Sequence, residues 1–587
     1  MLETLNTESK PRDVQLLPIG AETTVLRSRT WDRLRFEIEY ALQRGTTANS
    51  YLIEADKIAL IDPPGESFTE SFLTALKRRL DLTKLDYIIL GHINPNRLVT
   101  LNTLLKLAPQ ITIVCSNPAA QSLGNLLEST YPETSAAKLK ILVMRGEETL
   151  DLGQGHHLQF IPTPSPRWSD ELCIYDPKTK ILFTDKLFGA HVCSDQVFDE
   201  GWTTIGEDRR YYFDCLMAPH AKAIEAALEK LKELPTRLYA TGHGPLVRYS
   251  LIELTQFYRH WCEQQKSQET SVALIYASAY GNTATLAQAI ARGITKAGVA
   301  VESINCEAAT PEEIKEAVEK SAGFIIGSPT LGGHAPTPVQ TALGLVLSTA
   351  TKTKLAGVFG SFGWSGEAID LIEGKFRDAG YKFGFETIRV KFKPTDVTLK
   401  LCEEAGTDFA QALKKAKKAR TSRQPVGDSQ AARTEQAVGR LIGSLCIVTA
   451  KQGELKSAML ADWVSQATFT PPGLTIAVAK DRAIESLMHR GDKFVLNILE
   501  EGKHLGLMKH FLKPFSPGED RFAGVDMAEA DNGCPILNDA LAYVECTVEN
   551  RMECGDHWLI YGMVKNGKVL HSHGVTAVHH RKSGTHY

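Results

Sequence analysis

Residues 271–297 carry the clearest alternation of apolar and polar positions in the chain. The apolar, β-branched run from Val272 to Tyr276 predicts a buried strand. Apolar residues then recur at helical spacing: Leu286, Ala287, Ile290 and Ile294. A small polar loop joins the two elements: Ser278, Ala279, Tyr280, Gly281, Asn282 and Thr283. The free N–H groups and dipole of a helix N-terminus face such a loop, and hydroxyls add donors without charge. The pattern suits one terminal phosphate, although an ordinary strand–turn–helix connection has the same pattern.

Two later loops narrow this interpretation. Each follows another apolar strand and is rich in glycine and hydroxyl residues. The first contains Pro329, Thr330, Leu331 and Gly332, and the second contains Ser361, Phe362, Gly363, Trp364, Ser365 and Gly366. In a doubly wound parallel sheet the carboxyl ends of the strands meet at one edge, where ligands bind. The chain here resembles flavodoxin, which implies a flavodoxin-like doubly wound parallel sheet over residues 266–413 that binds FMN in these loops.

The N-terminal part, residues 1–265, shows a mixed α/β pattern that favours two sheets over one open sheet. Strands are expected at 50–53, 58–61, 87–90, 111–115, 158–161, 172–175, 181–183 and 237–240, with helices at 68–80, 98–108 and 219–234. Several strands end in polar loops with Asp62, His92 or His243. These loops resemble those of the metallo-β-lactamase-like domain of flavodiiron proteins, an αββα sandwich that precedes a flavodoxin domain.

The expected metal ligands are mostly absent from those loops. The family motif H-x-E-x-D-H is matched by His-Ile-Asn-Pro-Asn-Arg, a later histidine is replaced by arginine, and the bridging aspartate by lysine. The altered pocket therefore consists of His92, Asn94, Asn96, Arg97, Arg167, Lys186 and His243. Arginine and charged lysine cannot ligate a metal, and three cations about 6 Å apart repel by roughly 3 kcal/mol per pair. We expect no di-iron centre, and a pocket balanced by internal carboxylates such as Asp185 or by an anion such as chloride or phosphate. If the register at Lys186 is shifted by one residue, Asp185 becomes a ligand, and with His92 and His243 it can hold at most one weak metal ion.

A charged segment with few large apolar residues, 414–436, is interpreted as an exposed linker. Residues 437–587 then show short β-patterned runs, at 445–449, 474–479, 494–498, 542–548 and 558–564, which predict a small β-barrel. The segment Trp463-Val464-Ser465-Gln466-Ala467-Thr468-Phe469-Thr470-Pro471-Pro472 and the later Gly555-Asp556-His557 lie within it.

These segments resemble the NAD(P)H:flavin reductase domain, a split β-barrel. The resemblance implies that the first segment borders an FMN or FAD and that nicotinamide enters at the second. The candidate flavin contacts are Trp463, Ser465, Gln466, Ala467, Thr468, Lys480 and Arg482, and the candidate catalytic residues are Asp556 and His557. Lys480 or Arg482 can balance the flavin phosphate, and a histidine beside the flavin can position the nicotinamide.

Length and composition fit this division into modules. A chain of 587 residues is too long for one core, so two to four domains are expected. A net charge of −3 gives no reason to expect nucleic acid or an anionic membrane as a partner. The polar N-terminus lacks a signal-like apolar core, and no run reaches membrane-spanning length. Eleven scattered cysteines without a C-x-x-C pair favour reduced thiols in a cytosolic compartment.

Taken together, the three modules resemble the photosynthetic (cyanobacterial and plastid, class C) flavodiiron proteins, in a form with altered metal ligands. Ligand-complete members pass electrons from NAD(P)H through flavin to two irons and reduce O2 to water. The resemblance implies a head-to-tail homodimer or heterodimer and a location in the cyanobacterial cytosol or plastid stroma. We therefore expect an oxidoreductase subunit that passes electrons towards a ligand-complete partner chain. The alternative is a non-catalytic regulatory subunit, and O2 reduction at a flavin within this chain stays open. A metallo-hydrolase is disfavoured, because the loop of His92 offers one imidazole and no acid.

Overall fold

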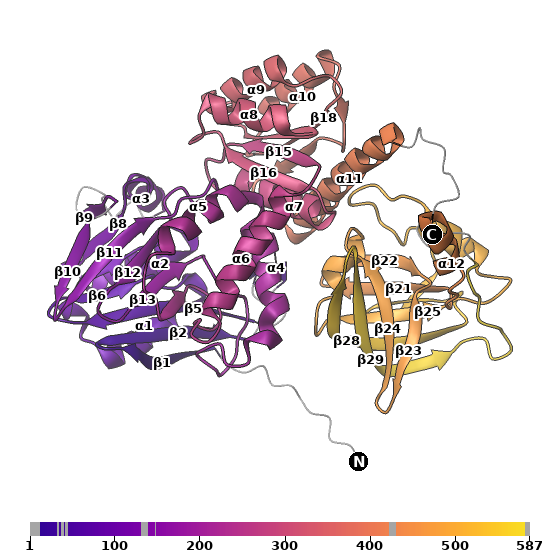
Figure 1. Ribbon diagram of the computed structural model, residues 1–587, viewed down its shortest axis with the longest axis horizontal. Coiled ribbons are helices and arrows are strands. Elements are labelled where there is room, and N and C mark those ends of the chain that lie inside the picture. Colours follow the sequence, from indigo (N-terminus) through magenta and orange to yellow (C-terminus); the bar gives the residue numbers. More distant parts are fainter. Residues whose placement is uncertain are drawn as a thin grey trace. The chain divides into compact units, whose positions relative to one another are not determined.

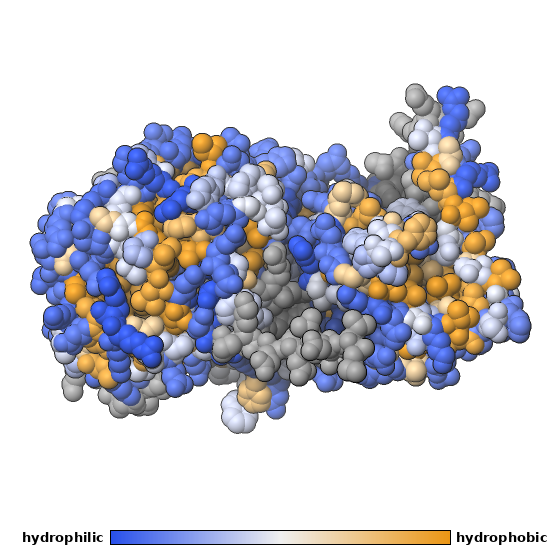
Figure 2. All heavy atoms as spheres, turned by 90° about the horizontal axis from the view of Figure 1, so that it is seen from below, coloured by the Kyte–Doolittle hydropathy of each residue, from blue (hydrophilic) through white to orange (hydrophobic). Residues whose placement is uncertain are grey.

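A computed structural model describes residues 12–31, 35–36, 40–41, 45–130, 139–146, 148–421 and 430–580. The chain divides into two compact units, Met1–Gln268 with Val301–Glu313, and Glu269–Ala300 with Ile314–Tyr587. Within the described ranges, no helix is both long enough and apolar enough to cross a lipid bilayer. Figure 1 shows the secondary structure, and Figure 2 shows that hydrophilic and hydrophobic residues are interspersed on the face it presents.

The first unit contains two sheets with helices packed on them, so the expected αββα sandwich is confirmed (Figure 1). One sheet has the order β1-β2-β5-β6-β7-β8-β9, with strands Asp13–Gly20, Thr23–Thr30, Thr46–Glu54, Ile58–Ile61, Leu85–Ile89, Thr112–Ser116 and Lys140–Met144. The other has the order β10-β11-β12-β13-β14, with strands Thr149–Gly153, His156–Pro162, Leu172–Asp176, Ile181–Asp185 and Leu238–Thr241. Helices α1 to α6 span Thr69–Arg79, Leu98–Leu107, Asn117–Thr130, Gly206–Leu216, Ala221–Leu231 and Leu251–Lys266, and β3 (Arg35–Phe36) pairs with β4 (Tyr40–Ala41).

Strand β2 is an element that the hydrophobic pattern did not predict. All eight of its residues are buried, although it contains Arg27 and Arg29. The Arg27 side chain donates to the carbonyls of Ser194 and Gln196, 3.1 and 2.7 Å away, and Arg29 pairs with Asp13. A buried strand can carry such residues because the carboxylate of Asp13 balances the charge of Arg29, and backbone carbonyls accept hydrogen bonds from one nitrogen of Arg27. The partners lie far away in the sequence, so no local pattern reveals them.

The flavodoxin-like domain is built on a sheet of order β16-β15-β17-β18-β19, with β20 paired to β18. Its strands are β15 (Ser271–Tyr276), β16 (Ala300–Asn305), β17 (Gly323–Pro329), β18 (Leu355–Phe362), β19 (Lys382–Phe383) and β20 (Ile388–Lys391). Helices α7 to α11 span Asn282–Lys296, Pro311–Lys320, Thr337–Thr349, Glu367–Asp378 and Asp396–Thr421. The pairings of β15 with β17 and of β17 with β18 are parallel, which confirms the doubly wound class.

The C-terminal domain is a curved sheet of order β22-β21-β25-β28-β29-β24-β23, in agreement with the expected split barrel (Figure 1). Strands β21 to β25 span Cys446–Gln452, Leu455–Ala461, Val464–Phe469, Pro472–Ala479 and Lys493–Ile498. The long strands β28 and β29 span Ala542–Cys554 and His557–Val569, and the short pair β26 and β27 spans Met527–Glu529 and Pro535–Leu537. Helices α12 and α13 span Gln430–Val438 and Leu505–Leu512.

Helical structure occupies part of the segment that was interpreted as a linker. Helix α11 continues to Thr421, and α12 covers 430–438. Residues 422–429 lie outside the described residues. Alanine, lysine and arginine are strong helix formers, so a composition that lacks core residues still extends a helix that began in the flavodoxin-like domain.

Candidate functional site

The phosphate-type loop lies where the sequence placed it, between β15 and α7. Gly281 caps α7 with a φ of 79°, a left-handed conformation that glycine adopts without strain. The Ser278 hydroxyl accepts a hydrogen bond from the backbone N–H of Ala284, 3.0 Å away, which folds the loop over the first turn of the helix. The N-terminus of α7 therefore opens into the loop, as an anion cradle requires.

The other two loops meet the first at the carboxyl edge of the sheet. The hydroxyls of Thr283 and Ser361 are 2.9 Å apart, which joins the first loop to the third. The backbone N–H of Thr330 donates to Ser361 O at 3.0 Å, which joins the second loop to the third. Among the described residues, the buried Thr330 hydroxyl has no hydrogen-bond partner. A buried orphan hydroxyl inside a ring of three loops is what a bound polar ligand would satisfy.

Aromatic side chains stand at the rim of these loops. Tyr280 is 80% exposed and Trp364 is 90% exposed. The ring of Phe392 lies edge-on to Trp364 with centroids 6.5 Å apart. The three loops thus combine hydroxyl donors, a helix N-terminus and flat apolar rings, and these residues fit FMN.

Phe392 was missed in the sequence, where it lies in an unremarkable loop after β20. Its φ of 60° is left-handed and strained for a bulky residue, and its backbone N–H donates to Phe362 O at 2.8 Å. Strain of this kind persists where the surroundings enforce it, often beside a ligand site. The only local signal was an aromatic residue between two lysines.

Replacing Phe392 with glycine is expected to change two properties in opposite directions. Relief of the left-handed strain stabilises the domain by up to about 1 kcal/mol. Loss of the Phe392 ring, which packs edge-on against Trp364, weakens FMN binding about three- to tenfold. FMN fluorescence titration of the apoprotein and thermal unfolding measure the two effects. Phe392→Ala, which removes the ring but keeps the strain, is the control; tighter FMN binding in either variant contradicts the assignment.

The altered pocket of the first unit is organised around Arg97. Asn94 caps the short turn of residues 95–97 by accepting the backbone N–H of Asn96, 3.0 Å away, and this turn delivers Arg97 into the interior. The guanidinium of Arg97 donates to Asp62 Oδ1 at 2.9 Å and to Asp185 Oδ1 at 3.0 Å. One arginine therefore bridges two buried carboxylates.

His92 joins the same network. Its Nδ1 forms a short hydrogen bond with Asp185 Oδ2, and both side chains are almost fully buried. Burial alone would raise the pKa of Asp185, but the charges of Arg97 and then His92 hold that pKa well below its ordinary value. Burial, with the charge of Asp185 added, raises the pKa of Asp62 to about 6. The expected counter-charge, Asp185, is thus present, and Asp62 is a second one.

The remaining residues of the altered pocket lie on different sides of it. A cavity of about 10 Å³ is lined by residues of the altered pocket and their neighbours: Asn94, Asn96, Arg97, Lys186 and His243, together with Ala48, Asn49, Asp62, Pro64, Gly65 and Gly242. His243 donates through Nδ1 to Thr47 O at 2.7 Å. Arg167 instead lies over the Trp168 ring, 5.0 Å from its centroid. Burial, with the charge of Arg167 added, lowers the pKa of the nearby His220 to about 3.

These residues do not fit a pair of iron ions. The carboxylates that remain near the histidines are hydrogen-bonded to Arg97, and a cavity of about 10 Å³ holds at most one water molecule. In the described part of the chain, no three His, Cys, Asp or Glu side chains gather as a metal ion requires. If the register at Lys186 is shifted by one residue, Asp185 takes the place of a metal ligand. In this structure, however, both oxygens of Asp185 form hydrogen-bonded ion pairs, one with His92 and one with Arg97.

In the C-terminal domain the candidate nicotinamide residues come together at one end of β24 and β29. The rings of Trp463 and His557 are 5.0 Å apart. His557 Nδ1 is 2.8 Å from Asp556 Oδ1, and its buried Nε2 has no hydrogen-bond partner among the described residues. The backbone N–H of Lys480 donates to Asp556 O at 2.9 Å, which ties the Lys480 loop to the same place. This cluster can present one imidazole nitrogen to a ligand.

The other candidate flavin contacts have different environments. Ser465, Gln466 and Ala467 are exposed on β23, and the Thr468 hydroxyl donates to Pro471 O at 2.7 Å. Lys480 Nζ is paired with Glu553 at 2.5 Å. Arg482 lines a crevice of about 160 Å³ with residues of α11 and α13. Lys480 and Arg482 therefore point to different places, which the sequence could not distinguish.

Comparison with known families divides the chain in the same order. Residues 46–244 match the family described as ODP family beta lactamase, residues 274–406 match Flavodoxin, and residues 438–585 match the Flavin reductase like domain.

Full-length relatives are cyanobacterial. The chain is 73% identical to diflavin flavoprotein A 6 of Nostoc sp., over 99% of this chain and 100% of the relative. It is 69% identical to diflavin flavoprotein A 3 of Synechocystis sp., over 98% and 96% of the two chains. Among solved structures, the metal-soaked Flv1 flavodiiron core from Synechocystis sp. is 70% identical, with a TM-score of 0.67, and covers 69% of this chain and 100% of that one.

Proposed function

The chain belongs to the cyanobacterial diflavin flavoproteins of the flavodiiron family, which makes it a flavin-binding oxidoreductase, and we propose that it passes electrons from NAD(P)H towards O2 reduction on a ligand-complete partner chain. The observation that carries the proposal is the contrast between its sites. Both flavin regions present the residues their chemistry needs, whereas the third site holds an arginine between two carboxylates.

The C-terminal domain receives the reductant in this proposal. Trp463 offers a flat face, and His557, oriented by Asp556, presents Nε2 to the nicotinamide carboxamide. Flavin held there, FMN or FAD, supplies the capacity to accept two electrons and release them singly. Ser465, Gln466, Ala467 and Thr468 on β23, with Lys480 or Arg482, would hold its polar edge and phosphate.

The loops of the flavodoxin-like domain would hold a second flavin, FMN. Ser278, Thr283 and the N-terminus of α7 would bind its phosphate, and Thr330 offers a hydroxyl to the ligand. Tyr280 and Trp364 would cover the ring and exclude water from it. The domain boundaries that we propose are 1–265, 266–413, a linker at 414–436, and 437–587.

The first unit contributes a scaffold without its own di-iron centre. Arg97 replaces the charge that metal ions would supply, and Lys186 gives the pocket a further cation beside which an anion such as chloride could bind. O2 would then be reduced on a ligand-complete flavodiiron chain in a head-to-tail heterodimer with this one, whereas a head-to-tail homodimer of this chain would need such a chain as a separate electron acceptor. The rate at which NAD(P)H reduces the flavins of the isolated chain distinguishes this role from that of a non-catalytic regulatory subunit.

Anaerobic mixing of the flavin-loaded protein with NADPH, and in parallel with NADH, tests the proposal. Prompt bleaching of the flavin absorption is expected, and His557→Ala should slow it about tenfold or more while the protein keeps its flavin. His573→Ala, an exposed histidine of the same domain, is the control and should bleach at the unmodified rate. Slow bleaching of the unmodified protein with excess FMN would favour the regulatory subunit instead.

A further inference from the structure

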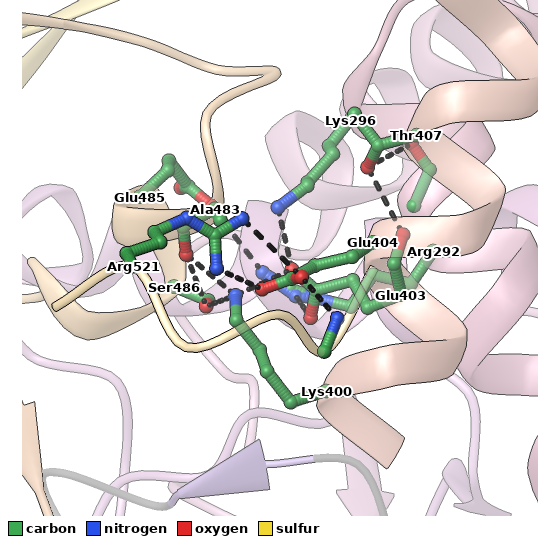
Figure 3. A network of polar contacts seen from close by, with 12 residues as sticks. Arg292, Lys296, Lys400, Glu403, Glu404, Thr407, Ala483, Glu485, Ser486 and Arg521 are labelled. Carbon is green, nitrogen blue, oxygen red and sulfur yellow. Dashed lines mark hydrogen bonds and ion pairs between the residues drawn. The ribbon is translucent and has the colours of Figure 1, made fainter. Parts of the chain in front are cut away.

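Charged side chains gather in the second unit where α11 of the flavodoxin-like domain meets a turn of the reductase domain (Figure 3). Glu403, on α11, is their centre and its side chain is 9% exposed. Its Oε1 lies 2.5 Å from Lys296 Nζ and 3.4 Å from Lys400 Nζ, and its Oε2 lies 3.7 Å from Arg292 Nη1. Burial alone would raise the pKa of Glu403, but these cations hold it well below its ordinary value.

Two of the cations reach across to the reductase domain. Lys400 Nζ donates to Ala483 O at 2.5 Å and to the Ser486 hydroxyl. Arg292 Nη2 lies 3.7 Å from Glu485 Oε2, a carboxylate that is 5% exposed. Within the reductase domain Arg551 holds Glu485 through a bond of 2.8 Å. Each domain thus offers a buried carboxylate near the cation Arg292.

A second ion pair crosses at the edge of this cluster. Glu404, next to Glu403 on α11, lies 3.3 Å from Arg521 and accepts the backbone N–H of Gly518 at 3.0 Å. Gly518 has a φ of 76°, and a Cβ there would stand 2.9 Å from Leu401 Cδ1. The left-handed φ favours glycine at this position, and the short distance to the end of the Leu401 side chain shows that the loop packs directly on α11.

The cluster lies close in sequence to both candidate flavin loops. Arg292 is on α7, the helix that begins directly after the phosphate-type loop, about 15 Å further along. Glu485 follows Arg482, the last of the candidate flavin contacts in the sequence, by three residues. Buried charge pairs are costly unless matched, so they select one arrangement of two surfaces over others.

We propose that Arg292, Lys400, Glu403, Glu404, Glu485 and Arg521 form an ionic joint that docks the reductase domain on the flavodoxin-like domain. The joint holds the two flavin sites in one fixed arrangement, so that electrons pass between them within a chain. The electron-transfer part rests on the function proposed above, whereas the docking does not.

The docking is tested in the full chain with a protease site placed between residues 421 and 430. After cleavage at low salt, the C-terminal fragment is expected to co-elute with the rest of the chain in gel filtration. Glu404→Arg should lower the co-eluting share about tenfold, because it sets two cations against each other in a desolvated contact. The double variant Glu404→Arg/Arg521→Glu should restore it. Lys315→Met, an exposed lysine on α8, is the control.

Separation of the unmodified fragments, or co-elution that Glu404→Arg leaves unchanged, would overturn the joint. Electron transfer between the two flavins is measured in the uncleaved chain loaded with both flavins. There Glu404→Arg should leave unchanged the first phase of bleaching by NADPH, which reports reduction of the flavin in the reductase domain. It should slow the second phase, which reports electron transfer to the FMN of the flavodoxin-like domain. The double variant should restore the rate of the second phase. A normal second phase in Glu404→Arg would overturn the electron-transfer part, whereas a missing first phase in the unmodified chain would contradict the proposed function and leave the docking result standing.

Discussion

Replacing Arg97 with methionine is expected to destabilise the lactamase-like first unit by about 3–5 kcal/mol at neutral pH. The substitution replaces the guanidinium with an apolar side chain of similar length, and it therefore removes the cation that bridges two buried carboxylates, Asp62 and Asp185. Two like charges then face each other in a site that water barely enters. Hydrogen exchange of peptides from β13 and β14, read by mass spectrometry, reports the opening free energy of this unit separately from the rest of the chain.

The pH dependence of the deficit follows from the two carboxylates. The pKa of Asp62 is raised to about 6 even with Arg97 present, so ionised Asp62 already costs stability as pH rises through 6. The pKa of Asp185 is depressed, so its contribution is present above its ordinary value of 3.8 and is lost as pH falls through the folded pKa. Without Arg97 both values rise, and Asp62 takes up a proton more readily. The deficit of Arg97→Met is therefore larger at pH 8 than at pH 5.

Arg79→Met provides a matched control in the same unit. Arg79 lies 2.6 Å from Glu54, but its side chain is 50% exposed, so loss of this pair costs about 1 kcal/mol or less. A deficit for Arg97→Met no larger than that of Arg79→Met, or one that grows as the pH falls, would show that Arg97 does not neutralise the pocket.

The flavodoxin-like site could be predicted because each of its parts has a local signal. A β-branched run, a hydroxyl-rich loop and a helical repeat follow one another within residues 271–297, and the strands that carry the three loops are neighbours in the sheet. The rule that parallel strands end at one edge then brought the loops together. It could not supply the contact between Thr283 and Ser361, or the strained Phe392, because these depend on tertiary packing.

The altered pocket was predictable only as a list of replacements. The sequence shows that Arg97 and Lys186 stand where ligands are expected, and charge balance requires carboxylates nearby. Which carboxylates these are depends on the meeting of strand ends 35 and 88 residues away from Arg97. The ionic joint had no signal in the sequence, because its members come from two helices, a turn and a loop, and each charged residue taken alone is typical of an exposed surface.

Restoring the ligands is expected to convert the pocket into a metal site. The variant Asn94→Glu/Asn96→Asp/Arg97→His/Arg167→His/Lys186→Asp removes three cations and adds three carboxylates, and imidazole with carboxylate is the donor set that iron favours. After anaerobic incubation with ferrous iron and removal of the excess, elemental analysis should find far below one iron in the unmodified chain and about two in the variant. Flavin content, measured in the same samples, normalises the protein concentration.

The decisive comparison is Asn94→Glu/Asn96→Asp alone, which adds acids but keeps Arg97, Arg167 and Lys186. If the cations exclude the metal, this variant should bind as little iron as the unmodified chain, because Arg97 and Lys186 can pair with the new carboxylates as Arg97 already pairs with Asp62 and Asp185. If it instead binds iron as well as the full variant, the missing acids alone kept the metal out. About two irons bound per unmodified chain would refute the exclusion of metal by the cations altogether. The guanidinium of Arg97 cannot bridge two carboxylates and at the same time leave them available as metal ligands.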